Sequence, residues 1–166
     1  MRAEWFPSYS ALSSRIRLQG ALAGFIGTAP MSISMVIGWR LLPRREKYHL
    51  PPRLIMNEIT ERAGIEDRMN EHELIGLTVF SHFSYGAFFG WLYTLFEHRL
   101  PFHSSLKGAL AGLALWAGSY LGWLPVLGIL PSALRHSWRR NLLMIVAHVI
   151  WGVTMSESLR KLTEKN

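Results

Sequence analysis

The sequence has no cysteine, few acidic residues and no recognisable catalytic motif. The absence of cysteine excludes disulfides, thiolate chemistry and cysteine-based metal sites. A glycine-rich phosphate loop, a His-Glu-x-x-His pair and a nucleophile elbow are all missing. The acids between residues 40 and 73 alternate with arginines, as they do on a solvated, ion-paired surface. We therefore expect no enzymatic activity, no metal site and no bound cofactor.

Charge is also missing from four long stretches of the chain. About 20 apolar residues cross a hydrocarbon core that is roughly 30 Å thick, and three of the stretches exceed that length. The last stretch is shorter, but Arg139 and Arg140 can snorkel at its start. The first is too long for a signal peptide and is not followed by a small-residue cleavage site. The sequence therefore predicts an all-α membrane protein, one integral membrane domain over 1–166, with transmembrane helices at about 18–39, 74–96, 108–134 and 141–158.

The net charge of +7 comes from 18 basic and 11 acidic residues. The basic residues gather at the ends of the predicted helices, where lipid phosphates lie, so we expect membrane lipid rather than nucleic acid as their partner. Lys and Arg are nearly balanced between the two sides, so the positive-inside rule does not give the orientation. Four helices place both termini on the same side.

Short motifs recur along the chain. Gly-Ala-Leu-Ala-Gly occurs at residues 20–24 and again at 108–112, and Leu-Pro occurs at 42–43 and 130–131. A histidine followed by an aromatic residue and glycine occurs at 82–86 and 148–152. These repeats predict two similar helical hairpins related by a pseudo-two-fold axis along the membrane normal. The alternative is chance, because Gly, Ala and Leu are common in membrane helices.

The long connection between the first two predicted helices contains a helix of its own. After two prolines, residues 53–63 have apolar side chains on one face, and Gly64 can end the helix in a left-handed conformation. We expect this short amphipathic helix to lie on the membrane surface. Glu66 and Asp67 favour the start of a second helix that begins in water and continues into the membrane. A solvated connection without such a helix is the alternative.

Small residues and prolines are expected to shape the packing. Lipid gives helices no hydrophobic drive to associate, so they pack through small residues. Four Gly-x-x-x-Gly pairs are present: Gly20 and Gly24, Gly86 and Gly90, Gly108 and Gly112, and Gly118 and Gly122. Pro30 and Pro125 each remove one backbone donor and should interrupt the helices that contain them.

Two histidines at membrane depth are the best candidates for function. His82 shares a helix face with Thr78 and Tyr85, and His148 has an aromatic partner at the same spacing. Three hypotheses remain open: interhelical hydrogen bonds that fix helix register, proton relay or pH sensing, and ligation of haem or a metal by facing imidazoles.

Three aromatic side chains share a face of the third predicted helix, close to Pro125. Trp116, Tyr120 and Trp123 could form a slot for a quinone or another aromatic ligand. We interpret them instead as core packing, because aromatic residues at helical spacing usually fill the interior.

The second half of the chain resembles the YagU-like family. The resemblance is carried by Ser81-His82, by residues 106–112, by Leu130-Pro131, and by the closing segments 147–151 and 157–162, and it covers roughly residues 74–162. Members of that family are small bacterial inner-membrane proteins without an assigned activity, loosely connected with acid tolerance. The resemblance implies a multi-pass protein of a bacterial plasma membrane, and it does not extend over the charged connection that follows the first predicted helix.

Taken as a sequence, the chain predicts a small membrane protein that acts through helix–helix contacts, as a homo-oligomer or as an accessory subunit of another membrane protein. The density of Gly-x-x-x-Gly pairs in a short chain is the reason. The alternative is a helical bundle that uses His82 and His148 to respond to pH or to conduct protons or small solutes. A second alternative is a membrane haem-binding protein.

Overall fold

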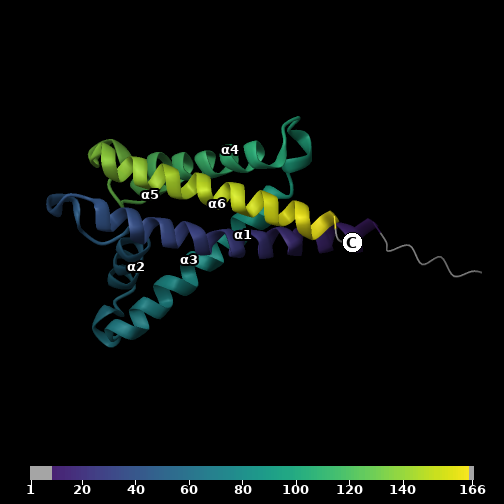
Figure 1. Cartoon of the computed structure of the whole chain (residues 1–166). Coiled ribbons are helices and arrows are strands. Elements are labelled where there is room, and N and C mark those ends of the chain that lie inside the picture. The colour runs from purple at the N-terminus through teal and green to yellow at the C-terminus, as the bar shows by residue number, and fades with distance from the viewer. Residues whose placement is uncertain (1–8, 165–166) are drawn as a thin grey trace, which may run out of the picture.

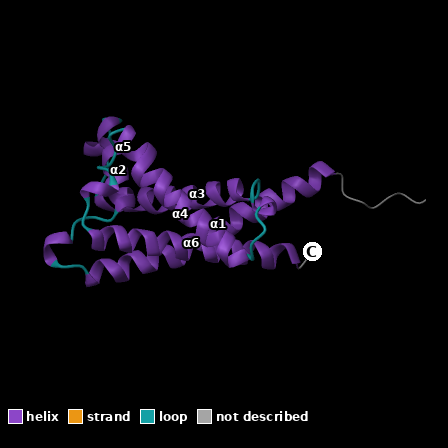
Figure 2. Ribbon diagram, turned by 90° about the horizontal axis from the view of Figure 1, so that it is seen from above, coloured by secondary structure: helices purple, strands orange, loops and turns teal. Residues whose placement is uncertain are grey.

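The computed structural model describes residues 9–164, and within them it is all-helical, with no strand (Figures 1 and 2). This confirms the predicted all-α class. The four long helices are α1 (Tyr9–Leu41), α3 (Glu71–Tyr93), α4 (Ser104–Ala117) and α6 (Trp138–Glu164). The short ones are α2 (Pro51–Arg62), a π-helical turn (Gly118–Trp123) that continues α4, and α5 (Leu124–Val126).

The long helices form a row rather than a closed ring. α1 packs between α3 and α6, and α6 packs between α1 and α4, so the spatial order is α3, α1, α6, α4. Figure 1 shows α4 and α6 running side by side, with α1 along the other side of α6. The first and last helices of the chain are therefore the two central ones.

Glycine allows two of these helix pairs to approach closely. A Cβ on Gly24 would lie 2.8 Å from the Cα of Gly90, and one on Gly90 would lie 2.7 Å from the Cα of Gly24. In the same way, a Cβ on Gly152 would lie 3.0 Å from the backbone nitrogen of Gly112. No side chain fits in these positions, so α1 with α3 and α4 with α6 are held in backbone contact.

Away from the glycine contact, α1 and α3 diverge, and α2 lies between their separated ends (Figure 1). The predicted helix after Pro51 and Pro52 is therefore present, and Gly64 (φ +63°) follows it in the left-handed conformation that was expected. The predicted second helix starts later than Glu66, at Glu71, where Asn70 and Glu73 form a reciprocal capping box. α2 covers the interior of the molecule on this side.

In the part of the chain that the structure describes, three helical segments, not four, are long and apolar enough to cross a membrane: Ser14–Leu41, Ser104–Val126 and Trp138–Glu164. They correspond to the spans expected at 18–39, 108–134 and 141–158. The span predicted at 74–96 is not among them, although α3 covers most of it and carries no charge there. A stretch without charge can still be polar. Uncharged polar side chains lower the mean hydropathy of α3: Thr78, Ser81, His82, Ser84 and Tyr85.

The third predicted span is also shorter and less regular than expected. Regular α-helix stops at Ala117, the π-helical turn follows, and Gly122 has non-helical backbone angles (φ −106°, ψ −108°). Pro125 removes the amide that would bond to Leu121, which explains the break at this point. The chain leaves the helix after Val126 and turns at Gly128 (φ +67°). By contrast, α1 continues as one helix through Pro30.

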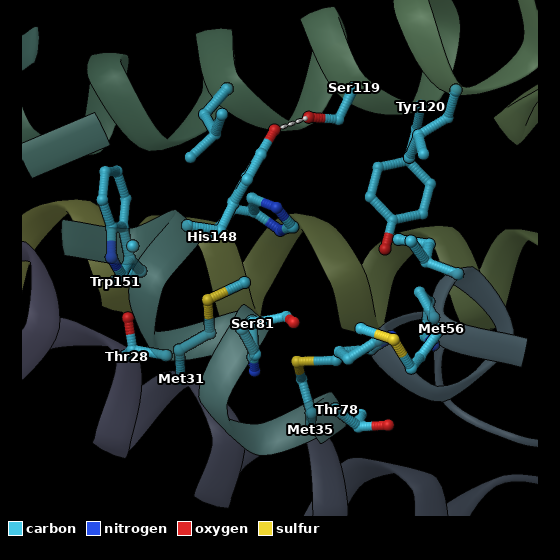
Figure 3. Close-up of a pocket in the computed structure, with 18 of the residues that line it drawn as sticks. Thr28, Met31, Met35, Met56, Thr78, Ser81, Ser119, Tyr120, His148 and Trp151 are labelled. Atoms are coloured by element: carbon cyan, nitrogen blue, oxygen red, sulfur yellow. Dashed lines mark hydrogen bonds between the residues drawn. The ribbon is translucent and has the colours of Figure 1, made fainter. Parts of the chain in front are cut away.

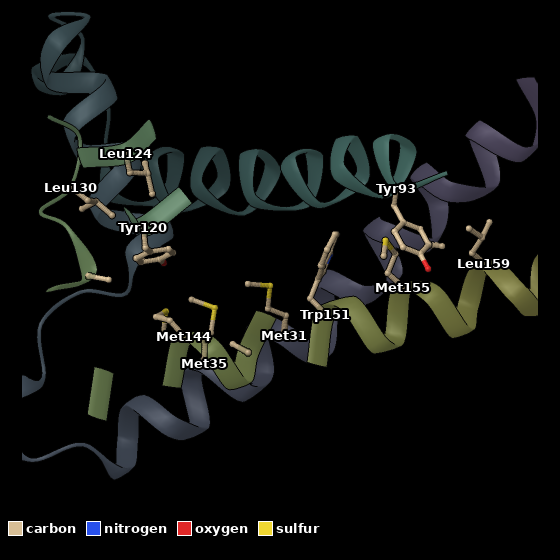
Figure 4. Close-up of a cluster of buried hydrophobic side chains, with 13 residues drawn as sticks. Met31, Met35, Tyr93, Tyr120, Leu124, Leu130, Met144, Trp151, Met155 and Leu159 are labelled. Atoms are coloured by element: carbon tan, nitrogen blue, oxygen red, sulfur yellow. The ribbon is translucent and has the colours of Figure 1, made fainter. Parts of the chain in front are cut away.

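The core is a line of large side chains between the central helices (Figure 4). Trp151, Met155 and Leu159 of α6 are 2% exposed or less, and Met31 and Met35 of α1 are buried beside them. The outer faces instead expose large apolar side chains, among them Leu18, Ile33, Phe80, Val126 and Leu134. Such a distribution suits helices whose outer surface meets lipid.

Candidate functional site: a polar-lined cavity beneath α2

A cavity of about 360 Å³ lies where α1 and α3 diverge; we call it the inner cavity. Its walls come from α1, α3, α6 and the π-helical turn, and α2 covers it (Figure 3). The volume falls at the lower end of the range for small-molecule pockets. The lining is mostly apolar, and no Asp, Glu, Lys or Arg belongs to it.

All four residues predicted as the intramembrane polar site, Thr78, His82, Tyr85 and His148, line this one cavity. The Tyr85 hydroxyl shares a hydrogen bond of 3.0 Å with the Ser119 hydroxyl, across the gap between α3 and the π-helical turn (Figure 3). The Thr78 hydroxyl donates to the Leu74 carbonyl, 2.7 Å away. Helical spacing puts Thr78, His82 and Tyr85 on one face of α3, and the fold turns that face toward the cavity.

The His148 ring has one nitrogen committed to the backbone. Its Nδ1 lies 2.7 Å from the Met144 carbonyl oxygen, which can only accept, so Nδ1 carries the proton and donates. In the neutral ring Nε2 is then a lone-pair acceptor. The Tyr120 ring meets the imidazole edge-on, with 5.8 Å between centroids and 90° between planes. His148 is 5% exposed and is held rigidly by these contacts.

His82 is fixed in the same protonation pattern by Ser32. The Ser32 hydroxyl donates its only proton to the Thr28 carbonyl, 2.8 Å away. The contact of 3.4 Å between Ser32 Oγ and His82 Nδ1 therefore has the imidazole as donor, which leaves Nε2 of His82 as an acceptor too. Both histidines of the inner cavity thus carry an unused lone pair.

Aromatic and sulfur-containing side chains supply most of the remaining wall. Tyr120, Trp123 and Trp151 line the cavity, together with Met31, Met35 and Met56. Of the three aromatic residues interpreted as core packing, Trp116 stacks on Tyr120 at 6.4 Å between centroids, whereas Tyr120 and Trp123 reach the cavity itself. The methionines and Ser119 were not singled out in the sequence, because nothing in their spacing distinguishes them from ordinary core residues.

Hydrogen bonds cross the end of the cavity that lies nearest the glycine contact. The Trp151 indole donates to the Gly24 carbonyl at 3.1 Å, and the Thr28 hydroxyl donates to the same oxygen at 2.9 Å. Gly86 stands directly against Thr28. These buried groups join α1, α3 and α6, and a further hollow of about 450 Å³ shares Leu115 and Trp151 with the inner cavity.

Arginines hold α2 in place over the cavity. At its start, Arg53 pairs with Glu71 of α3 at 2.6 Å. At its end, Arg62 donates to the carbonyls of Leu127 and Gly128, at 2.8 and 3.0 Å. The hydrogen bond from Arg53 lowers the pKa of the Glu71 carboxyl below its ordinary value. α2 is therefore tethered to the elements on both sides of the cavity.

A buried arginine anchors the connection between α1 and α2. The Arg140 guanidinium donates to the carbonyls of Glu46, Tyr48 and His49, at 2.8, 3.2 and 3.1 Å. It also lies over the Tyr48 ring, 3.5 Å from the centroid. His136 accepts or donates a hydrogen bond of 2.8 Å with the Tyr48 hydroxyl, and burial, together with the nearby charge of Arg140, lowers the His136 pKa.

A second hollow of about 520 Å³ lies between α1 and α3 on the outer side; we call it the outer groove. Four residues line both the outer groove and the inner cavity: Met35, Pro52, Thr78 and His82. The rest of the groove includes apolar side chains on the outer surface, such as Val36, Ile75 and Val79. His82 therefore stands in the wall between the interior and the outer surface of the helix row.

The arrangement is suited to holding a small uncharged molecule rather than an ion. In the part of the chain that the structure describes, no group of three His, Asp or Glu side chains could hold a metal ion. Both histidines line the cavity, but in the described structure their imidazoles do not hydrogen-bond to each other. What they offer is a pair of neutral acceptors in an otherwise apolar space.

Comparison with known proteins gives a family but no characterised relative. A profile of the family described as "Protein of unknown function (DUF1440)" matches residues 33–157. This range includes α2, the arginines that tether it and all four polar residues predicted from the sequence. It is consistent with the YagU-like resemblance without confirming that name, and it also covers the charged connection that the resemblance left out. No curated protein and no solved structure matches the chain.

Proposed function

We propose, from the premise that the chain belongs to the family of proteins of unknown function (DUF1440), that it is a membrane protein that binds a lipid-soluble small molecule in the inner cavity. The observation that carries the proposal is the junction of the two hollows at His82. Only this wall separates the outer surface between α1 and α3 from the polar-lined interior, and it is the entry that we assign to the ligand. Binding, rather than catalysis, is the role we assign to the protein.

Three further features support this role. The inner cavity has uncharged polar groups at fixed positions in an apolar wall, which is the usual character of a ligand site. On the side away from α2, the Trp151 indole and the Thr28 hydroxyl both donate to the Gly24 carbonyl and hold α1 and α6 together at the end of the cavity. α2 lies over it as a cover whose ends are held by surface arginines.

The hypothesis of a homo-oligomer or an accessory subunit stays a prediction, but its original reason no longer favours it. That reason was a surplus of glycine faces. Six of the eight predicted packing glycines lie in contacts within the chain, and only Gly118 and Gly122, in the π-helical turn, have open space around them. Association with a second membrane protein would have to use another surface.

The histidine hypotheses also stay predictions. For proton conduction, the inner cavity supplies His82, His148 and the Tyr85–Ser119 pair, but no Asp, Glu, Lys or Arg lines it. For haem, two unused Nε2 atoms are of the right type. The volume of about 360 Å³ is small for such a group, so we rank a smaller ligand first.

We further propose a bacterial plasma membrane as the location and duplication of a helical hairpin as the origin of the fold. The first rests on the sequence resemblance. The second is supported by the matching contacts: Gly20 and Gly24 face Gly86 and Gly90, while Gly108 and Gly112 face the stretch from His148 to Ser156. In both pairs the helix with the histidine motif meets the helix with the Gly-Ala-Leu-Ala-Gly motif.

The binding role is tested with a cavity-filling variant and a matched control. Ser81→Phe places a ring in the inner cavity, whereas Ser84→Phe adds the same ring to the exposed face of the same helix. The probe is 1-bromo-4-butylbenzene, whose bromine quenches tryptophan fluorescence on contact, and Trp123 and Trp151 line the cavity. In detergent micelles we expect saturable quenching of the wild type and of Ser84→Phe.

Ser81→Phe should show only the linear quenching that comes from partition of the probe into the micelle. Equal quenching curves for all three proteins would refute the proposal. Circular dichroism and size-exclusion chromatography establish that each variant is folded, and Thr78→Phe fills the same cavity if Ser81→Phe fails to fold. Native mass spectrometry of the same samples reports any small molecule that stays bound through purification, and its mass should be lost in the filled variant.

A further inference from the structure

We propose that the ligand of the inner cavity is an uncharged aromatic hydroxyl compound, of the phenol or quinol class, whose hydroxyl proton is accepted by a histidine Nε2. This rests on the proposed binding role and specifies its substrate class. Some polar atoms around the cavity already bond within the protein, and those that remain define the groups that a ligand must bring.

Four donors of the cavity wall are committed to the protein itself. Nδ1–H of His148 is used by the Met144 carbonyl, and Nδ1–H of His82 by Ser32. The hydroxyl protons of Thr28 and Thr78 are used by the carbonyls four residues earlier in their own helices. What these side chains still offer is lone pairs, and a ligand must bring a proton to meet them.

Donor capacity also remains in the cavity wall. Among the described residues, the Ser81 and Tyr120 hydroxyls have no hydrogen-bond partner, and the Tyr85–Ser119 pair keeps one of its two protons free. A ligand group that both donates and accepts therefore satisfies the cavity best. A hydroxyl does both, whereas a carbonyl or an ether can only accept and would leave both imidazole lone pairs unmet.

Charge and shape narrow the class further. A carboxylate, phosphate or ammonium group would be buried without a counter-charge, because no Asp, Glu, Lys or Arg lines the inner cavity. The wall contains four aromatic residues, Tyr85, Tyr120, Trp123 and Trp151, and three methionines. Aromatic rings and thioethers make favourable contacts with another ring, so a flat aromatic body fits better than a branched aliphatic one.

The proposal is tested with three probes of similar size, each measured by isothermal titration calorimetry against the full-length protein in micelles. The probes are 4-butylphenol, 4-butyltoluene, which replaces the hydroxyl by a methyl group, and 4-butylcyclohexanol, which keeps the hydroxyl but has no aromatic ring. Titration of the Ser81→Phe variant supplies the partition background. The wild type should bind 4-butylphenol about tenfold more tightly than either other probe.

Paired histidine variants test the acceptor. Asparagine places its amide donor where Nδ1–H stood and removes Nε2, whereas glutamine places a carbonyl oxygen near the Nε2 position. The double variant His82→Asn with His148→Asn should therefore lose most of the preference for 4-butylphenol over 4-butyltoluene. The double variant with glutamine should retain it to within about threefold. A preference that survives in the asparagine pair would overturn the assignment to the imidazoles.

Failure of this inference can be told from failure of the binding role. If 4-butyltoluene binds as tightly as 4-butylphenol, and both are lost in Ser81→Phe, the cavity binds ligands but the hydroxyl assignment is wrong. If 4-butylcyclohexanol matches 4-butylphenol, the aromatic assignment is wrong and an aliphatic alcohol takes its place. If no probe binds above the Ser81→Phe background, the binding role fails as a whole.

Discussion

Replacing Gly24 by alanine should loosen the contact on which the inner cavity depends. The new Cβ would lie 2.8 Å from the Cα of Gly90, where ordinary contacts begin at 3.4 Å, and the carbonyl oxygen of Gly86 is closer still. Both obstacles are backbone, so no side chain can move aside. α1 and α3 must separate, and a gap of 0.5–1 Å already forfeits a quarter to a half of the contact energy of the atoms involved.

We expect this substitution to lower the free energy of unfolding by about 1–3 kcal/mol, the usual cost of overpacking. The measurement is titration with sodium dodecyl sulfate from mild-detergent micelles, followed by tryptophan fluorescence. The control is Gly76→Ala, on an exposed part of α3 where a Cβ would meet nothing within 4 Å. That change should be neutral or stabilising, by up to about 1 kcal/mol, because alanine restricts the unfolded chain.

A double-mutant cycle sharpens the prediction. Gly90→Ala opposes Gly24 from the other helix, with its Cβ 2.7 Å from the Cα of Gly24, and should cost a similar amount. Once the first methyl group has separated the helices, the second needs less additional movement, so the double variant should cost less than the sum of the two. If Gly24→Ala unfolds with the same free energy as Gly76→Ala, the close contact between α1 and α3 is not as described.

Three further predictions concern the groups that hold α2 and its connection. Arg140→Met leaves three backbone carbonyls unpaired, so it should cost about 2–3 kcal/mol and speed limited proteolysis of the residues between α1 and α2. Because His136 has a lowered pKa in the folded state, its contribution to stability is complete above the ordinary pKa of 6.5 and is lost as the pH falls below that value. In His136→Gln, the midpoint temperature of unfolding should therefore depend less on pH between pH 7.5 and 5.5. Glu71→Gln removes a partly exposed ion pair with Arg53, and it should cost less than about 1 kcal/mol, with the difference shrinking in high salt.

The position of the polar residues could be predicted from the sequence, because it depends on helix periodicity alone. Thr78, His82 and Tyr85 recur at spacings of four and three, so any α-helix puts them on one face, and a membrane protein buries such a face. The same reasoning applied to His148. That both faces line one cavity follows from the order of the helices in the row, which no local pattern encodes.

Other features could not be predicted in this way. The span at 74–96 was inferred from an absence of charge, but the hydroxyl and imidazole groups of α3 that make the site also make the helix less apolar. That α2 covers the inner cavity depends on the space left where α1 and α3 diverge, which its own residues do not encode. The contact of Arg62 with Gly128 joins residues that are 66 positions apart, so it could not be anticipated from the neighbourhood of either residue.

The central place of α1 and α6 has a consequence for the order in which the protein is made. Of the four long helices, α1 leaves the ribosome before the others, but the helix that covers its second side is synthesised after the other three. Until α6 arrives, the Gly24 carbonyl lacks the Trp151 indole and the inner cavity lacks one wall. A chain that ends before Trp138 retains the residues of the α1–α3 contact and of the outer groove, yet it lacks His148 and Trp151 in the inner cavity. Synthesis of α6 and formation of the binding site are thus the same event.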